Sequence, residues 1–158
     1  MISGRIYAVG FQNVSVSAVQ DLIAVYAGAS KIFGLLSVNI GQVTGTTVQN
    51  LRWRIRYLPS VVTAGSAGSA GTVKPILPGD AAATITARIN DTTQATTGGT
   101  AVDLWDDVFN TINGALWVPP TPGRPFVCGL SGAIVISLDQ APASALTMSG
   151  SVTVEELP

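Results

Sequence analysis

The sequence predicts an all-β fold, an antiparallel jelly roll or β-sandwich of about eight strands, in a single domain that spans residues 1–158. Three observations predict it. Val, Ile and Thr make up 46 of the 158 residues, and these β-branched side chains favour strands over helices. Apolar and polar residues alternate in several short segments. Clusters of Gly, Pro, Ser and Thr that are typical of turns separate those segments.

The clearest strand runs from Leu51 to Tyr57, where every odd position is apolar and every even position is Arg. Only an extended strand separates such a pattern into two faces. Residues 133–138 are almost all apolar, which indicates a strand buried on both faces. The same reasoning, with the turn residues as boundaries, predicts further strands at residues 6–11, 21–26, 32–40, 83–89, 114–118 and 151–155.

Two segments do not follow the strand pattern. Apolar residues between Val102 and Ile112 recur at helical spacing, so residues 101–110 form either a short helix or a strand. Residues 63–71, with the sequence TAGSAGSAG, carry only small side chains. Burying such side chains releases too little free energy to offset the entropy lost on ordering. We therefore expect a flexible Ala/Gly/Ser loop at 63–71, or one that only a neighbouring subunit orders.

The composition excludes several classes of function. The chain has no His, the usual general base and the commonest ligand of transition metals, and Cys128 is its only Cys, so it has no intrachain disulfide. A formal charge of -1 gives no long-range attraction to nucleic acid. No nucleotide-binding glycine motif, signal-peptide pattern or run of 18 apolar residues occurs. We expect no enzymatic activity, no cofactor or metal, and no nucleic-acid or membrane partner.

Three arginines are the candidate interface of this chain. Arg52, Arg54 and Arg56 lie on one face of the predicted strand, in a row about 13 Å long. They are three of the eight basic residues of the chain, and they lie within five positions. They either dock on an acidic surface of another protein or are solvated charges that protect the strand from unwanted pairing. Arginine suits the first role because its planar head binds carboxylates in a bidentate manner.

Acidic residues and the single cysteine have plainer interpretations. The side chains of Asp103, Asp106 and Asp107 diverge on a helix and on a strand, so they do not form a catalytic carboxylate pair. They are expected at a solvated helix start, or in salt bridges with the arginines. Cys128 lies in an apolar run and is expected to be a buried thiol.

The three tryptophans allow two interpretations. Trp53, Trp105 and Trp117 either pack in the core or form a platform for a carbohydrate, as aromatic side chains do in many sandwich-fold modules. Each is flanked by residues of core or strand character, which favours core packing. The carbohydrate interpretation rests on analogy between folds and not on a site.

Short motifs along most of the chain resemble a known family. They are VGFQNVSV at 9–16, AVQDL at 18–22, NIGQ at 39–42, PGDAA at 78–82, TTGGT at 96–100 and LTMSG at 146–150. This set resembles small structural proteins of tailed bacteriophages, of the jelly-roll head decoration or cement type. The resemblance implies a non-enzymatic protein that oligomerises on the capsid and clamps neighbouring capsid subunits. It carries over no catalytic, metal or binding residues, and loop 63–71 is where this chain departs from the family.

The residues and the resemblance together predict a virion structural protein, a capsid decoration protein that binds and stabilises the major capsid shell. We expect it to form a homo-oligomer, a dimer or a trimer, at the capsid surface after assembly in the host cytoplasm. Its extended termini, residues 1–5 and 155–158, are expected to add strands to a neighbour. The alternatives are a neck, tail or baseplate component and a carbohydrate-binding β-sandwich module.

Overall fold

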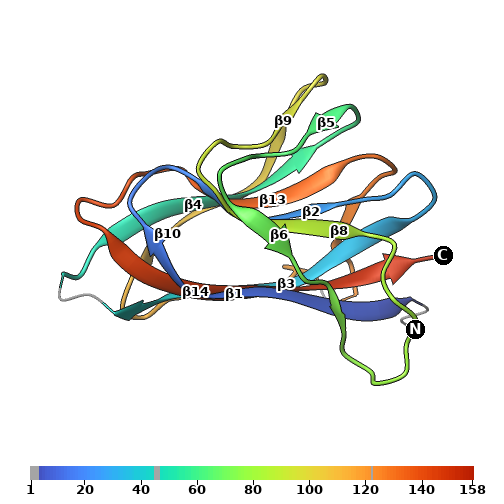
Figure 1. Cartoon of the computed structure of the whole chain (residues 1–158), viewed down its shortest axis with the longest axis horizontal. Helices are drawn as coiled ribbons and strands as arrows, with labels where there is room; N and C mark the ends of the chain where they lie inside the picture. Colours follow the sequence, from blue (N-terminus) through green and yellow to red (C-terminus); the bar gives the residue numbers. More distant parts are fainter. Residues whose placement is uncertain (1–3, 45–46, 122) are drawn as a thin grey trace.

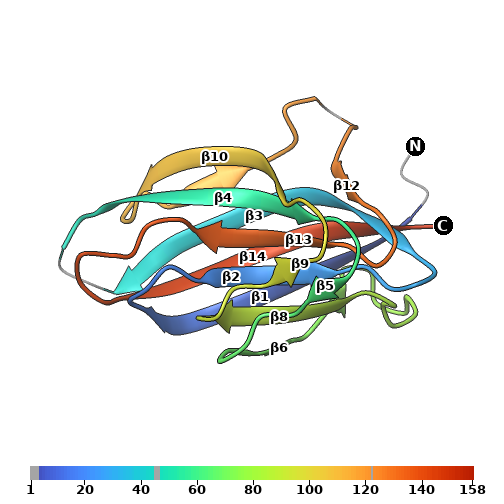
Figure 2. The ribbon, with the colours of Figure 1, turned by 90° about the horizontal axis from the view of Figure 1, so that it is seen from above.

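Two antiparallel sheets pack face to face in a computed structural model that describes residues 4–44, 47–121 and 123–158 (Figures 1 and 2). Sheet A contains, in spatial order, β11 (Ala115–Trp117), β3 (Ile32–Thr44), β14 (Leu146–Leu157), β1 (Arg5–Val16) and β7 (Lys74–Pro75), with β12 (Phe126–Cys128) also paired to β3. Sheet B contains β10 (Val102–Asn110), β4 (Asn50–Leu58), β13 (Ala133–Leu138), β2 (Asp21–Tyr26), β8 (Thr86–Asp91) and β6 (Ser69–Gly71). The predicted β-sandwich is confirmed, and its connectivity is consistent with a jelly roll.

Each of the eight predicted segments overlaps a strand, although β8 begins three residues after the start of the predicted segment 83–89 and ends two residues beyond it. Strands β2 and β13 have the predicted bounds, and residues 114–118 contain only the short β11. Strands β1, β3 and β14 are longer than expected, because each continues through polar residues that the alternation pattern does not include. The three long strands lie side by side and form the centre of sheet A.

The C-terminal arm is not free to reach a neighbour, contrary to expectation. Residues 155–157 belong to β14, where Glu156 pairs with Arg5 of β1 on one side and with Phe33 of β3 on the other. Both edges of this strand are therefore occupied within the chain's own sheet. Residues 1–3 of the predicted N-terminal arm lie outside the described residues.

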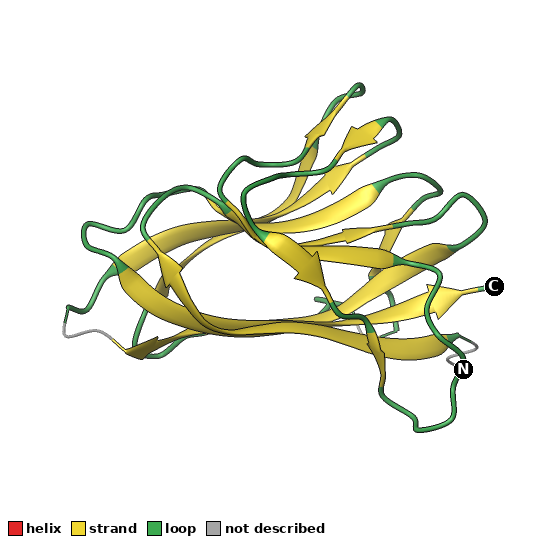
Figure 3. Cartoon of the chain, in the orientation of Figure 1, coloured by secondary structure: helices red, strands yellow, loops and turns green. Residues whose placement is uncertain are grey.

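Residues 101–110 are not a helix, and the described part of the chain contains none (Figure 3). They form β10, which pairs along its length with β4. A β-bulge falls between Asp103 and Trp105, which lie opposite Arg56 and Ile55. The bulge adds one residue to the strand, so the apolar side chains on either side of it are spaced three apart. This insertion accounts for the interval from Val102 to Trp105, whereas Val108 continues the helical spacing only because an apolar residue lies on the outer face, opposite Arg52.

Part of the small-residue segment 63–71 is a strand. Residues 69–71 form β6 and pair with β8, and Ser66 forms an isolated bridge with Thr93. Between them the amide of Gly68 donates to Asp91 Oδ1 at 2.9 Å. A Cβ atom at Gly68 would lie 2.2 Å from the carbonyl oxygen of Ile89, so only glycine fits this approach. Contacts within the chain therefore order this end of the segment without a neighbouring subunit.

The main core lies between the two sheets, and a second, smaller core lies on the outer side of sheet B. All six residues of β13 are buried, as predicted, because Ile134 and Ile136 face the main core while Ala133 and Val135 face the second. Ala95 also belongs to the second core, although it comes from a segment outside sheet B.

A flap covers this second core. It consists of residues 59–68 and 92–98, which include the paired strands β5 (Val62–Thr63) and β9 (Thr96–Thr97). Figures 1 and 2 show β5 and β9 on the side of sheet B that faces away from sheet A. The hydroxyl of Thr97 donates to the carbonyl oxygens of Pro59 and Ser60 and so joins the two halves of the flap. The molecule therefore has three layers over part of sheet B.

Candidate interaction surfaces

The arginine stripe, Arg52, Arg54 and Arg56, lies on the outer face of sheet B. Trp53 and Ile55, which alternate with the arginines on β4, are buried in the main core, so the arginines point away from it. The predicted strand and its two faces are confirmed. Cross-strand neighbours of the stripe come from β10 and β13.

Carboxylates of the same chain surround the stripe. Arg54 Nη1 lies 3.3 Å from Asp139 Oδ1 and 3.5 Å from Asp103 Oδ2, and Arg56 Nε lies 3.7 Å from Asp103 Oδ1. The side chains of Arg54 and Arg56 are only 20% and 15% exposed, whereas that of Arg52 is 62% exposed. All three arginines thus form ion pairs within the subunit, but Arg52 has only a 3.8 Å pair with Asp139 and is the one most accessible to solvent or a partner.

Asp103 forms these ion pairs because the β10 register places it opposite Arg56. The expected salt bridge between the acidic residues and the arginines is therefore present for Asp103. Asp106 lies opposite Arg54 on the outer face, and Asp107 lies opposite Trp53 on the inner face. The two adjacent carboxylates diverge, as predicted, although on a strand and not at a helix start.

A buried carboxylate holds the flap to sheet B. Asp21 of β2 is 1% exposed. Its Oδ2 accepts the amide of Ala95 at 2.7 Å, and its Oδ1 accepts the hydroxyl of Ser137 at 2.8 Å and the side-chain amide of Gln94 at 3.1 Å. Burial raises the pKa of Asp21 above its ordinary value, and these donated hydrogen bonds oppose the rise. The carboxyl group therefore joins β2, β13 and the flap.

A second buried carboxylate fixes the other half of the flap. Asp91, at the end of β8, accepts two hydrogen bonds from the guanidinium of Arg88, at 2.8 and 2.7 Å. Its Oδ1 also accepts the amide of Gly68. Asp21 and Asp91 are direct neighbours across β2 and β8. The two acidic side chains thus anchor both chain segments that form the flap.

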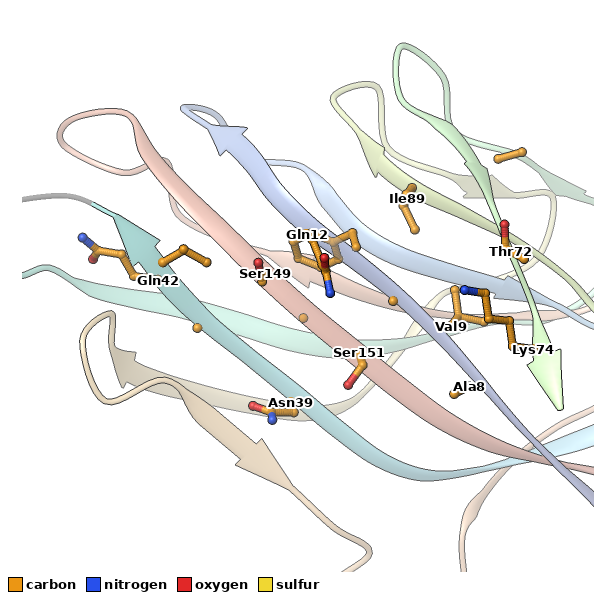
Figure 4. Close-up of a pocket in the computed structure, with 16 residues that line it drawn as sticks. Ala8, Val9, Gln12, Asn39, Gln42, Thr72, Lys74, Ile89, Ser149 and Ser151 are labelled. Atoms are coloured by element: carbon orange, nitrogen blue, oxygen red, sulfur yellow. The ribbon is translucent and has the colours of Figure 1, made fainter. Parts of the chain in front are cut away.

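The outer face of sheet A is open and nearly free of charge. A trough of about 730 Å³ crosses its central strands (Figure 4). Amide and hydroxyl side chains from three adjacent strands lie in it, and Lys74 of β7 is the one charged residue of its described lining. The labelled polar groups are Gln12 of β1, Ser149 and Ser151 of β14, and Asn39 and Gln42 of β3. Small polar side chains allow another backbone to approach this face closely.

One long side of the sandwich is unusually apolar. Strand β10 forms an edge of sheet B, β11 and β12 form an edge of sheet A, and Figure 2 shows β10 and β12 along the same side. This region carries six of the thirteen exposed large apolar side chains in the described residues, and Leu116 is 74% exposed. We call them the apolar side: Val102, Val108, Ile112, Leu116, Val118 and Val127.

All three tryptophans meet at one cavity on this side. Trp53 and Trp117 are buried in the core, as the favoured interpretation predicted, and Trp105 is half-buried. The rings of Trp105 and Trp117 pack edge to face with centroids 6.4 Å apart. A cavity of about 360 Å³ lies between β10 and β11. Its lining includes the three indoles and the polar side chains of Asp107, Asn110 and Asn113, and we call it the tryptophan pocket.

Cys128 is the buried thiol that the sequence predicts. It lies in β12 and is fully buried. Burial raises the pKa of its thiol to about 12, so the thiol stays protonated at neutral pH and is a poor nucleophile. Within the described ranges, no three His, Cys, Asp or Glu side chains group closely enough to hold a metal ion. No helix of the described residues has the length and apolar character needed to cross a membrane.

Sequence reasoning found the arginine stripe but not the surfaces around it. It missed the anchoring role of Asp21 and Asp91, and the available signal was an acidic residue at the end of an otherwise apolar strand, as in DLIAVY at 21–26. It also did not place the three tryptophans at one cavity, because nothing in their spacing shows that β4, β10 and β11 converge.

Comparison with known proteins gives no relative. No family model, curated protein or solved structure matches this chain.

The Asp21 anchor makes a prediction about stability. Because burial raises the folded-state pKa of this carboxyl, its protonated form favours folding at low pH, and that contribution is lost as pH rises through the folded-state pKa. Relative to Asp21→Asn, the free energy of unfolding of the wild-type protein should therefore fall as pH rises from below about 4. Urea unfolding from pH 3 to pH 8 measures this difference.

The matched variant Asp21→Ala tests the hydrogen bonds themselves. It leaves the amide of Ala95 and the hydroxyl of Ser137 buried without their acceptor. The free energy of unfolding should therefore fall by about 2–3 kcal/mol. Asp21→Asn should cost less, because an amide can still accept from Ala95 and donate to Ser137. If the wild-type protein instead became more stable than Asp21→Asn as the pH rises, the donated hydrogen bonds would lower the pKa of Asp21 by more than burial raises it.

Proposed function

We propose that the protein is a structural component of a tailed-phage virion, a decoration protein that binds the outside of the major capsid shell as a homo-oligomer. The observation that carries the proposal is the apolar side, where six large apolar side chains are exposed on one side of a small domain. Large apolar side chains that stay exposed along one side of a domain are typical of interaction sites. The motif resemblance to decoration proteins and the low charge of the chain support the same assignment.

The apolar side suits contact with a neighbour in an assembly. The side chains of Leu116 and Val118 point outward from β11, while Trp117 between them packs in the core. Val127 lies on β12 at the same edge of sheet A. Covering such side chains contributes about 25 cal/mol for each Å² of apolar surface removed from water. A partner that covers this side therefore gains binding energy without changing the fold.

The open face of sheet A provides a second surface for neighbours. Its trough is lined by amides, hydroxyls and glycines together with apolar side chains such as Val9, Val43 and Ile89, and Lys74 is the charged group of the described lining. Such a face pairs with another polar surface through hydrogen bonds and excludes few charges from water, so the desolvation cost is small. Weak contacts of this kind hold a shell together when many copies act at once, because the local concentration on the shell is high.

The arginine stripe contributes less to this proposal than the sequence suggested. Arg54 and Arg56 form ion pairs with Asp103, so reversing all three charges would place several carboxylates together and destabilise sheet B. Arg52 alone combines high exposure with a single long ion pair, 3.8 Å to Asp139. A docking role for the stripe stays a prediction, and Arg52→Glu tests it while leaving the pairs of Arg54 and Arg56 with Asp103 in place.

Copy number tests the proposed function directly. Quantitative mass spectrometry of purified particles should give a ratio to the major capsid protein that approaches one, or a fixed large fraction of one, because a decoration protein follows the lattice of the shell. A ratio of a few per cent would instead indicate a neck, tail or baseplate component. Absence from the particles would contradict a virion role altogether.

Single substitutions distinguish the candidate surfaces. Leu116→Asp should weaken co-sedimentation with particles at least tenfold, a loss of about 1.4 kcal/mol, because it places a charge in the covered apolar side. Leu116 is exposed, so the thermal midpoint of the free protein should stay unchanged. The matched control is Ile76→Asp, at an exposed apolar residue after β7 and outside β10 to β12. Equal binding by Leu116→Asp and wild type would remove the apolar side from the interface, and loss with Arg52→Glu alone would assign docking to the stripe.

A further inference from the structure

One edge of sheet A is only partly covered. The short strand β7 pairs with β1 near the start of β1, where the amide of Ile76 donates to the carbonyl oxygen of Ile6 at 2.9 Å. The N–H and C=O groups of alternate residues point to the same edge of a strand, so those of Gly10 and Gln12 point to this edge as well. No described residue pairs with them there, and both residues are exposed. Beyond β7, strand β1 therefore presents an open edge.

Sheet B overhangs this open edge and forms a recess with it. Gly71 of β6 lies so close to β1 that a Cβ atom there would be 3.2 Å from Cγ1 of Val9 and 3.3 Å from Cγ2 of Ile89. Figure 4 shows Ile89 and Thr72 on the side of β1 that faces away from β14. These residues line one end of the trough of about 730 Å³. We call this end the edge recess, lined by Gly10, Gln12, Ala70, Thr72 and Ile89.

The edge recess fits a single extended strand better than a second folded copy of the chain. A copy that paired its own β1 here would bring its β6 along, because β6 lies against β1 within the subunit. That strand would need the space that β6 of the first copy already occupies. An extended peptide carries no second layer, so it can lie under the overhang of sheet B.

The surroundings of the recess define the chemistry of such a peptide. Antiparallel pairing continues the order of sheet A and directs the C-terminal end of the peptide towards Lys74. Lys74 is exposed, and the ion pairs among the described residues do not include it. A carboxylate at that end of the peptide would therefore meet a cation without a partner. Alternate side chains of the peptide would face Ala70 and Ile89, which suits small apolar residues.

We propose that the open edge of β1 binds an extended arm of a partner protein, which adds to sheet A as an antiparallel strand. The arm alternates small apolar with polar residues and carries a carboxylate near Lys74. Main-chain hydrogen bonds to Gly10 and Gln12 supply affinity, and the edge recess supplies the preference for side chains. The inference goes beyond the proposed function, because it assigns a peptide-binding site to the free subunit. A result against it would leave the copy-number test of the virion role unaffected.

Selection from a displayed library of random peptides, each about seven residues long to match the open part of β1, tests the proposal on the free protein. Enriched peptides should alternate apolar and polar residues and carry Asp or Glu near the C-terminal end. A fluorescent copy of an enriched peptide should bind saturably when titrated by fluorescence polarisation. Gln12→Pro should weaken this binding about tenfold, because proline removes the N–H that points to the open edge and its ring occupies the place of the bond.

Gln12→Ala is the matched control, since it removes the same side chain but keeps the main-chain N–H. It should bind the peptide as the wild type does. Lys74→Glu should weaken binding of a peptide that ends in Asp about fivefold, and replacement of that Asp by Lys should restore it. Thermal unfolding of the three variants confirms that they fold.

A change in the peptide tests the same hydrogen bonds without altering the protein. Two versions of an enriched peptide are N-methylated, each at one of the two sets of alternate residues. One version should bind and the other should not, because only one set of amides faces β1. Absence of enriched peptides would overturn the proposal, as would equal binding by both methylated versions. A dimer in sedimentation that Gln12→Pro dissociates, without binding of any peptide, would overturn it in favour of a second copy.

Discussion

The architecture depends on one buried acidic side chain, Asp21, which accepts hydrogen bonds from both sheet B and the flap. An unpaired carboxylate in that position would be costly, so the Ala95 amide and the Ser137 hydroxyl must stay in place around it. Asp91 repeats the arrangement beside it, through Arg88 and Gly68. The chain itself consequently closes the part of the outer face of sheet B that lies under the flap. Any partner therefore has to bind elsewhere, on the face of sheet A, on the apolar side or at the rim near Arg52.

This constraint connects the fold to the proposed function. A chain with only 11% charged residues uses much of its charge internally, in the Asp21 and Asp91 clusters and in the ion pairs of Arg54 and Arg56. The surfaces that remain open are polar but uncharged on sheet A and apolar along β10 to β12. Such surfaces suit permanent contact with neighbours better than free diffusion in water. The tryptophan pocket opens onto the apolar side, since Val108 and Leu116 belong to both.

Local patterns predicted the fold class and most strands, because period-two alternation and turn residues are properties of adjacent residues. They failed where the signal is not local. The bulge in β10 adds one residue and so imitates helical spacing, and the small residues near Gly68 are ordered by Asp91, which is 23 positions away. The arginine stripe was placed on the correct face, but its ion pairs with Asp103 and Asp139 depend on which strands flank β4. Likewise, no spacing of Trp53, Trp105 and Trp117 shows that they share one cavity.

The proposed function requires the apolar side and the face of sheet A to be covered in the assembled state. Hydrogen exchange measured by mass spectrometry, on the free protein and on the same protein bound to its particle, tests it most directly. We expect slower exchange on binding in β10 to β12 and in the strands of sheet A, with little change in the flap, because Asp21 and Asp91 already hold the flap in the free protein. Protection confined to the flap and β6, with β11 and β12 unchanged, would show that the protein does not assemble through these surfaces.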